Sequence, residues 1–170
     1  MSKETIIRAR KGERKAVETL LREWQPRIYN FALKHLGNPD DASDVTQQVL
    51  FTVSRKISGL REVGAFSVWV FSIAMNEIRK VWGERRREVL LQVPPSAGEK
   101  EGLAFAALHL LPPHQREIIL LKEVEGFSIR EISRILSVPE GTVKSRLFYA
   151  LKALREQYLR LKEEAYGRPQ

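Results

Sequence analysis

Apolar residues recur at the spacing of an α-helix along almost the whole chain, and segments that alternate polar and apolar residues are few. The pattern predicts a nearly all-α protein. It is clearest from Ser128 to Arg155, where two helices are expected on either side of Ser137-Val138-Pro139. Ser128 and Glu131 have the spacing of a capping box at the start of the first helix, and Pro139 suits the start of the second.

The second of these helices is predicted to have two different faces. Its apolar side is formed by Val143, Leu147, Ala150, Leu151 and Leu154. The opposite side holds Ser145, Phe148, Tyr149 and Lys152, flanked by Lys144, Arg146 and Arg155. A helix with donors and aromatic residues on its free face and cations beside them fits a DNA major groove. The alternative is a helical hairpin with a solvated basic face.

Further helices are expected before this pair. One begins at Gly12, and Pro26 either kinks it or begins a second helix that runs to Leu36 and stops at Gly37. Asn38 is a predicted cap for a helix that ends near Lys56, with Pro39 and two aspartates in its first turn.

The third predicted helix spans 65–87 and becomes increasingly basic. We expect Phe66, Val70, Ile73, Ala74 and Val81 to share its apolar face. Ser72, Met75, Asn76 and Arg79 are predicted to point away from that face. Glu77 falls on the apolar side, which implies a buried partner or a rotated helix.

The segment 88–101 contains Pro94-Pro95 and loses the helical pattern, so it is the predicted linker between two domains. Helices 102–111 and 114–125 follow and should form the base for the pair at 128–155. The tail after Arg155 is expected to fray.

Charge and composition restrict the function classes. The 170 residues carry a net charge of +8, which favours a polyanionic partner. Residues 1–88 hold 17 basic and 11 acidic residues, so the basic character is concentrated in the first half. Cysteine is absent, the N-terminus lacks an apolar signal core, and no apolar run approaches a membrane span. These features predict a cytoplasmic protein without membrane insertion.

Three other classes compete with a DNA-binding factor. An enzyme is disfavoured because His35, His109 and His114 are scattered, and because no phosphate loop or nucleophile elbow is present. The carboxylates of Asp40, Asp41 and Asp44 are explained by a helix start. A dimeric repressor or response-regulator output domain has a similar recognition helix but needs two-fold symmetry or a receiver domain. A pure interaction module remains a third alternative.

Particular motifs resemble those of bacterial extracytoplasmic-function sigma factors. LPPHQREIILLKEVEGFSIREISRILSVPEGTVKSRL is similar to the family's region four, and Gly141-Thr142-Val143-Lys144-Ser145-Arg146 is its most specific part. Ser137 stands at a turn position where the family often has glycine. Residues 41–51 resemble region two, with Ser43 and Gln48 in place of two usual glutamates, and residues 69–76 resemble its Trp-Leu-x-x-Ile-Ala-x-Asn signature.

This resemblance implies specific roles. Core RNA polymerase would bind Asp44, Gln47 and Gln48. The minus-ten element would be taken by Asn76 and the loop 60–64, with the single strand following Arg79, Lys80, Arg85, Arg86 and Arg87. The minus-thirty-five element would be read by Lys144, Ser145 and Phe148, with Thr142 and Arg146 on the DNA backbone. Tyr149, on the same face, is a further candidate DNA contact and stands where the family commonly has a basic residue.

The expected architecture is therefore two small helical domains joined by a flexible linker. Residues 1–87 would form a region-two-like helical bundle, 88–101 the linker, and 102–170 a four-helix, region-four-like helix-turn-helix domain. The resemblance implies core RNA polymerase, promoter DNA and an anti-sigma factor as partners. It implies no catalysis, no cofactor and no metal.

Overall fold

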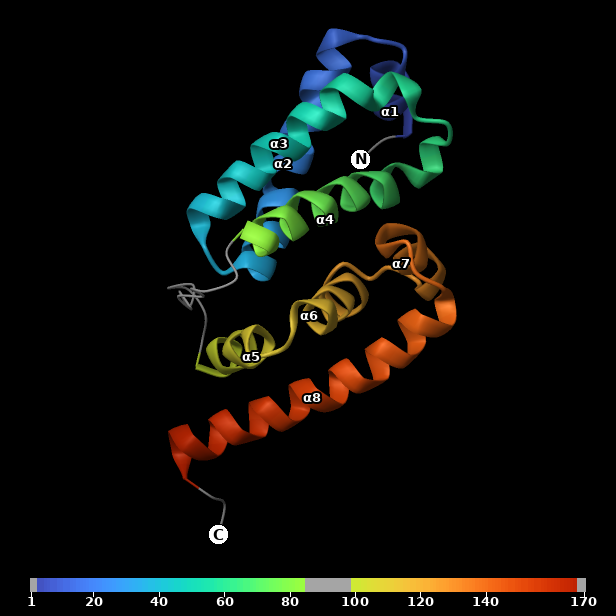
Figure 1. The fold of residues 1–170 in the computed structure, drawn as a ribbon. Coiled ribbons are helices and arrows are strands. Elements are labelled where there is room, and N and C mark those ends of the chain that lie inside the picture. The colour runs from blue at the N-terminus through green and yellow to red at the C-terminus, as the bar shows by residue number, and fades with distance from the viewer. Residues whose placement is uncertain (1–2, 85–98, 168–170) are drawn as a thin grey trace. The chain divides into compact units, whose positions relative to one another are not determined.

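The computed structural model describes residues 3–84 and 99–167, and every regular element within these ranges is helical. The chain divides into two compact units (Figure 1). One contains α1 to α4, and the other contains α5, α6, the first part of α7, and α8. The predicted all-α architecture with two helical domains is thus confirmed, while the domain limits at 87 and 101 stay predictions.

The first unit is a small helical bundle. Its elements are α1 Lys3–Arg10, α2 Arg14–Leu36, α3 Pro39–Lys56, the 3-10 turns η1 Ile57–Gly59 and η2 Val63–Ala65, and α4 Phe66–Glu84. The long helix α2 packs against α1, α3 and α4, and α3 also packs against α4. The short helix α1 was not anticipated from the sequence.

An aromatic cluster forms the centre of this unit. The Trp24 and Phe66 rings meet edge to face with centroids 5.1 Å apart, and Phe31 and Phe71 do the same at 4.7 Å. The Arg27 guanidinium lies 4.9 Å from the centroids of both Trp24 and Phe71. Edge-to-face pairs each contribute about 0.5–1.5 kcal/mol beyond their burial, so this cluster holds α2 and α4 together firmly.

The junction between α2 and α3 forms as the sequence predicts. Gly37 adopts a left-handed conformation (φ 68°) and its amide donates to the Leu33 carbonyl at 2.8 Å. The Asn38 side-chain oxygen then accepts from the amides of Asp40 at 2.9 Å and Asp41 at 3.0 Å. A glycine that ends α2 is thus followed directly by an asparagine that caps the start of α3, and the two residues fix where one helix stops and the next begins.

Pro26 does not begin a new helix, because α2 is continuous through it. A proline inside a helix removes one backbone hydrogen bond and crowds the preceding turn. Here Trp24 and Ile28, on either side of the proline, are both buried in the bundle. Tertiary packing thus maintains the helix across its weakest position.

The predicted faces of α4 need two corrections, one at Met75 and one at Ile73 and Val81, which were expected on the apolar face but are only half-buried. Met75 was expected to point away from the apolar face, but it is fully buried. Both α2 and α3 pack on α4, so its buried side is wider than one stripe and includes Phe71 and Ile78. Glu77 is half-buried, and its carboxylate lies 2.7 Å from the Lys80 ammonium; because the Lys80 side chain is 65% exposed, this partner lies at the surface and is not buried as predicted.

The second unit is built around the longest helix of the described chain. Its elements are α5 Glu99–His109, α6 Pro113–Ile119, the π-helical turn η3 Leu120–Val124, the first part of α7 (Ile129–Leu136) and α8 Glu140–Tyr166. Helix α8 packs against both α5 and α6. Part of the predicted linker is helical, since α5 begins at Glu99, before the expected start at Gly102.

The predicted fraying after Arg155 is wrong, because α8 continues to Tyr166. Leu154, Tyr158 and Leu161 are half-buried along this extension, so the helix keeps a packed side beyond the predicted end. Leu151, which was expected on the apolar face, is 39% exposed. The buried side of α8 is therefore narrower than the sequence pattern suggested and is centred on Val143 and Ala150.

Candidate nucleic-acid and protein interfaces

The turn between α7 and α8 sets the position of the candidate recognition helix. The Ser128 hydroxyl accepts from the Glu131 amide at 3.2 Å, and the Glu131 carboxylate accepts from the Ser128 amide at 2.8 Å, so the predicted capping box is present. Ser137 ends α7 in the left-handed region (φ 55°, ψ 45°). The Ser133 hydroxyl donates to the Val138 carbonyl at 2.6 Å and closes the turn.

The outer face of α8 is as the sequence predicts. Val143 and Ala150 are fully buried, whereas the side chains of Lys144 and Ser145 on the other side are exposed. Thr142 and Arg146 are half-buried at the edges of this face. The structure therefore brings the predicted contacts to one side of the helix start.

Two aromatic residues dominate this outer face. Phe148 is 67% exposed and Tyr149 is 62% exposed. Their rings meet edge to face with centroids 5.3 Å apart, so they form one apolar surface beside the polar side chains of the preceding turn. Large aromatic side chains at such exposure are typical of residues that contact a partner.

Of the residues predicted to bind single-stranded DNA, those on α4 lie within the described part of the chain. Asn76 is exposed, and Arg79 is half-buried one turn later. Lys80 pairs with Glu77 but remains 65% exposed, so its charge still reaches solvent. The three remaining cations of the predicted basic groove, Arg85, Arg86 and Arg87, lie outside the described residues.

The candidate polymerase-binding residues share one face of α3. Asp44, Gln47 and Gln48 are all exposed and recur at helical spacing. One turn further, Phe51 is 59% exposed, with the Arg55 guanidinium 5.8 Å from its ring centroid. Sequence reasoning missed Phe51, although its spacing from Gln47 and Gln48 places it on the same stripe.

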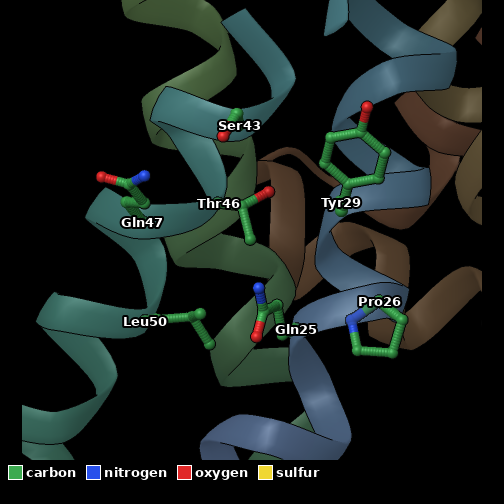
Figure 2. A pocket seen from close by; sticks show the side chains of 7 residues that line it. All are labelled: Gln25, Pro26, Tyr29, Ser43, Thr46, Gln47 and Leu50. Carbon is green, nitrogen blue, oxygen red and sulfur yellow. The ribbon is translucent and has the colours of Figure 1, made fainter. Parts of the chain in front are cut away.

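A depression of about 260 Å³ adjoins this stripe between α2 and α3 (Figure 2). Its lining is neutral and mixed in polarity and consists of Gln25, Pro26, Tyr29, Ser43, Thr46, Gln47 and Leu50. The Thr46 hydroxyl is already engaged, since it donates to the Ala42 carbonyl at 2.6 Å. Gln47 belongs both to the depression and to the exposed stripe of α3.

The described residues hold no group of three or more histidine, aspartate or glutamate side chains that could bind a metal ion. The helices within ranges 3–84 and 99–167 are also too short or too polar to cross a membrane.

Each of the two units matches a known family model. Residues 20–88 match the family model for Sigma-70 region 2, and residues 104–154 match that for Sigma-70, region 4. The ECF RNA polymerase sigma-E factor of Haemophilus influenzae is 26% identical over 89% of this chain and 92% of that protein. The ECF RNA polymerase sigma factor SigW of Bacillus subtilis is 29% identical over 92% of this chain and 96% of that protein.

A solved structure supports the same assignment. The sigma factor RpoE of Bartonella quintana, crystallised in complex with the anti-sigma factor NepR, has a TM-score of 0.70 and 26% identity over 82% of this chain and 94% of that chain. Members of this family are not enzymes. The chain belongs to the sigma-70 family and is an extracytoplasmic-function RNA polymerase sigma factor that initiates transcription.

Proposed function

We propose that the outer face of α8 reads the minus-thirty-five element of the promoter. The observation that carries this proposal is the division of the helix start: Val143 is fully buried, while Lys144, Ser145 and Phe148 face solvent. The major groove admits a helix and offers donors and acceptors that Lys144 and Ser145 can pair with. In this proposal Thr142 and Arg146, at the edges of the face, contact the DNA backbone, and Tyr149 makes an apolar contact.

The first unit takes the minus-ten element in this proposal. Asn76 on α4 and the loop 60–64 hold an extruded base of the non-template strand, which offsets part of the cost of unstacking the duplex. The single strand then follows the cations of α4 and of the chain after it: Arg79, Lys80, Arg85, Arg86 and Arg87. The exposure of Asn76 and of Lys80 on the same helix supports this role. The protein would thus assist promoter opening as well as promoter binding.

Core RNA polymerase binds the exposed face of α3 in this proposal. Asp44, Gln47 and Gln48 supply hydrogen bonds, and Phe51 supplies the apolar contact that a protein interface needs at its centre. The depression beside Gln47 would accept a side chain of the polymerase, because the same residue borders both surfaces. A face with one carboxylate and two amides depends less on charge than a face with several carboxylates.

The proposed organisation assigns residues 1–87 to core and minus-ten binding, 88–101 to a linker and 102–170 to minus-thirty-five binding. We place the protein in the cytoplasm, where core polymerase and promoters are. The Bartonella quintana relative is bound to an anti-sigma factor, and we propose that an anti-sigma protein also restrains this chain.

Run-off transcription tests the proposal directly. Purified protein is added to core polymerase with a library of genomic promoter fragments. The expected result is initiation from a small set of fragments that share a two-part promoter, and loss of these products with Lys144→Ala. Initiation that stays equally strong and equally selective with Lys144→Ala would contradict the role of α8.

A further inference from the structure

Arg10 connects the first helix to a loop far along the chain. It is the last residue of α1, and its Nη1 atom donates to the carbonyl of Leu60 at 3.4 Å and to that of Arg61 at 3.3 Å. These carbonyls lie 50 and 51 residues away in the sequence. Both belong to the stretch between η1 and η2 that precedes α4.

This stretch is extended, which explains why it needs an outside donor. Leu60 (φ −64°, ψ 116°) and Glu62 (φ −121°, ψ 118°) leave the helical region between the two 3-10 turns. Extended backbone leaves the hydrogen-bond ladder of a helix, so the carbonyls of Leu60 and Arg61 depend on water or on side chains. A guanidinium can hold two neighbouring carbonyls because its donors are rigidly arranged.

The contact fixes the backbone and leaves side chains available. Leu60 is buried under the loop, whereas Arg61, Glu62 and Gly64 are exposed. Arg10 contacts the loop through main-chain oxygens only. The outer side of the loop therefore remains accessible to a ligand while its path is held in place.

The donor itself is mounted on a firmly attached helix. Ile6 and Ala9 of α1 are buried, and α1 packs along α2. It also contacts both η1 and η2, at the connection between α3 and α4 (Figure 1). Arg8, two residues before Arg10, instead pairs with Glu13, which directly precedes α2.

We infer that α1 braces the minus-ten loop and that Arg10 is a positioning residue for minus-ten recognition. The inference rests on the proposed function of the loop 60–64. Holding two consecutive carbonyls reduces the number of conformations of the free loop, so less ordering entropy is lost when a base is bound. Arg10 acts through the loop and does not touch DNA.

The test compares Arg10→Met with Arg8→Met in holoenzyme. Methionine keeps an apolar stem and removes the donors, and Arg8→Met removes the same charge without touching the loop. Open-complex formation is measured on a promoter with the preferred minus-ten element and on one with that element substituted. For Arg10→Met we expect opening on the preferred promoter to fall about three- to tenfold, as the loss of one or two hydrogen bonds implies. Core affinity should stay within about twofold.

The preference between the two promoters separates positioning from a general structural role. Arg10→Met should bring the ratio of the opening rates on the preferred and the substituted promoter closer to one. Arg8→Met should leave that ratio unchanged. Equal losses on both promoters, or the same narrowing with Arg8→Met, would overturn the inference. The dependence of promoter binding on salt is a further readout. The slope of log affinity against log salt concentration should be the same for Arg10→Met and the unchanged protein. A slope smaller by about one in Arg10→Met would show a direct phosphate contact and would also overturn the inference.

Hydrogen exchange in the free protein tests the brace without DNA. The amides of Leu60 and Ala65, which bond to the carbonyls of Ile57 and Glu62, should exchange faster in Arg10→Met than in Arg8→Met. Equal exchange in the two variants would contradict the inference. Should Arg10→Met fail to fold, Arg10→Gln replaces it, since its side chain stays polar but is too short to hold both carbonyls. An unchanged promoter preference in Arg10→Gln would then overturn the inference.

Failure of the inference can be distinguished from failure of the proposed function. The variants Asn76→Ala and Arg61→Ala/Glu62→Ala remove candidate contacts of the site itself. If neither alters the minus-ten preference, the proposed function of this site is wrong. If they alter it and Arg10→Met does not, the site stands and only the brace is wrong.

Discussion

The guanidinium of Arg116 closes the end of α5 by donating to the carbonyl of His109 at 2.9 Å. It also donates to the carbonyls of Leu108 at 3.3 Å and Leu111 at 3.1 Å. The last carbonyls of a helix have no partner within the helix, so a buried donor from α6 takes their place. Burial lowers the pKa of Arg116 to about 10, which still leaves the group charged at pH 7.

Arg116→Met should therefore destabilise the second unit. The change leaves buried carbonyls at the end of α5 without this donor, and we expect a loss of about 2–3 kcal/mol in the free energy of unfolding. Urea denaturation followed by circular dichroism measures it. Arg130→Ala, an exposed arginine on α7, is the control and should change stability by less than about 0.5 kcal/mol. Equal effects of the two changes would show that the buried contacts contribute little.

Ser137→Gly should stabilise the protein. A left-handed conformation costs a residue with a Cβ atom roughly 1–2 kcal/mol, and the larger unfolded-state entropy of glycine cancels part of that gain. The expected net increase is about 0.5–1 kcal/mol in the free energy of unfolding. Ser137→Ala is the control, because alanine keeps the Cβ atom. A stabilisation by alanine equal to that by glycine would exclude backbone strain as the cause.

Lys144→Ala should weaken binding to the minus-thirty-five element and leave core binding intact. A lost base contact costs about 1–3 kcal/mol and relaxes the preference at one position, whereas a lost phosphate contact weakens all sequences and lowers the salt slope by about one. Holoenzyme binding to promoter variants at several salt concentrations distinguishes these outcomes. Lys162→Ala, an exposed lysine near the other end of α8, is the charge-matched control. A similar loss with Lys162→Ala would indicate general electrostatics.

Asn76→Ala should impair promoter opening more than closed-complex binding. The proposed contact forms only after the base leaves the duplex, so its loss raises the energy of the open complex by about 1–3 kcal/mol. Permanganate footprinting of unpaired thymines measures opening, and gel shift at low temperature measures closed binding. Asn30→Ala, an exposed asparagine on α2, is the control. Equal losses in both assays would contradict the assigned role.

Gln47→Ala should weaken the complex with core polymerase and leave the fold unchanged. The side chain is exposed at the border of the depression between α2 and α3, so its removal deletes hydrogen bonds worth about 0.5–1.5 kcal/mol at the interface. Fluorescence anisotropy of labelled protein with core enzyme gives the dissociation constant. Glu23→Gln, an exposed change on α2, should have no effect. Unaltered core affinity in Gln47→Ala would remove this face from the docking surface.

Local signals made much of the fold predictable. Asn38 and Ser128 cap helices through atoms two or three residues away, and such contacts are visible in a short stretch of sequence. Met75 was misplaced for the opposite reason: a helical pattern gives one apolar stripe, but two neighbouring helices cover α4 from different directions. The continuation of α8 was missed because its half-buried residues are spread thinly among charged ones.

The candidate sites, like the fold, were predictable in part and depended in part on tertiary packing. The resemblance supplied positions such as Lys144, and the structure shows which side of each helix they occupy. Phe51 was missed because an isolated aromatic residue at helical spacing is ordinarily part of a core. No local pattern could reveal the contact of Arg10 with Leu60, since 50 residues separate them. Contacts between residues so far apart in the sequence are recognised only in the three-dimensional structure.

The unbroken course of α8 has a consequence for how this sequence can vary in length. One inserted residue rotates everything beyond it by about 100° around the helix axis. An insertion after Ala153 would leave the start of α8 in place and turn Tyr158 and Leu161 away from their packed side. Additions within the helix are therefore tolerated only in steps of whole turns, whereas additions after Tyr166 carry no such penalty.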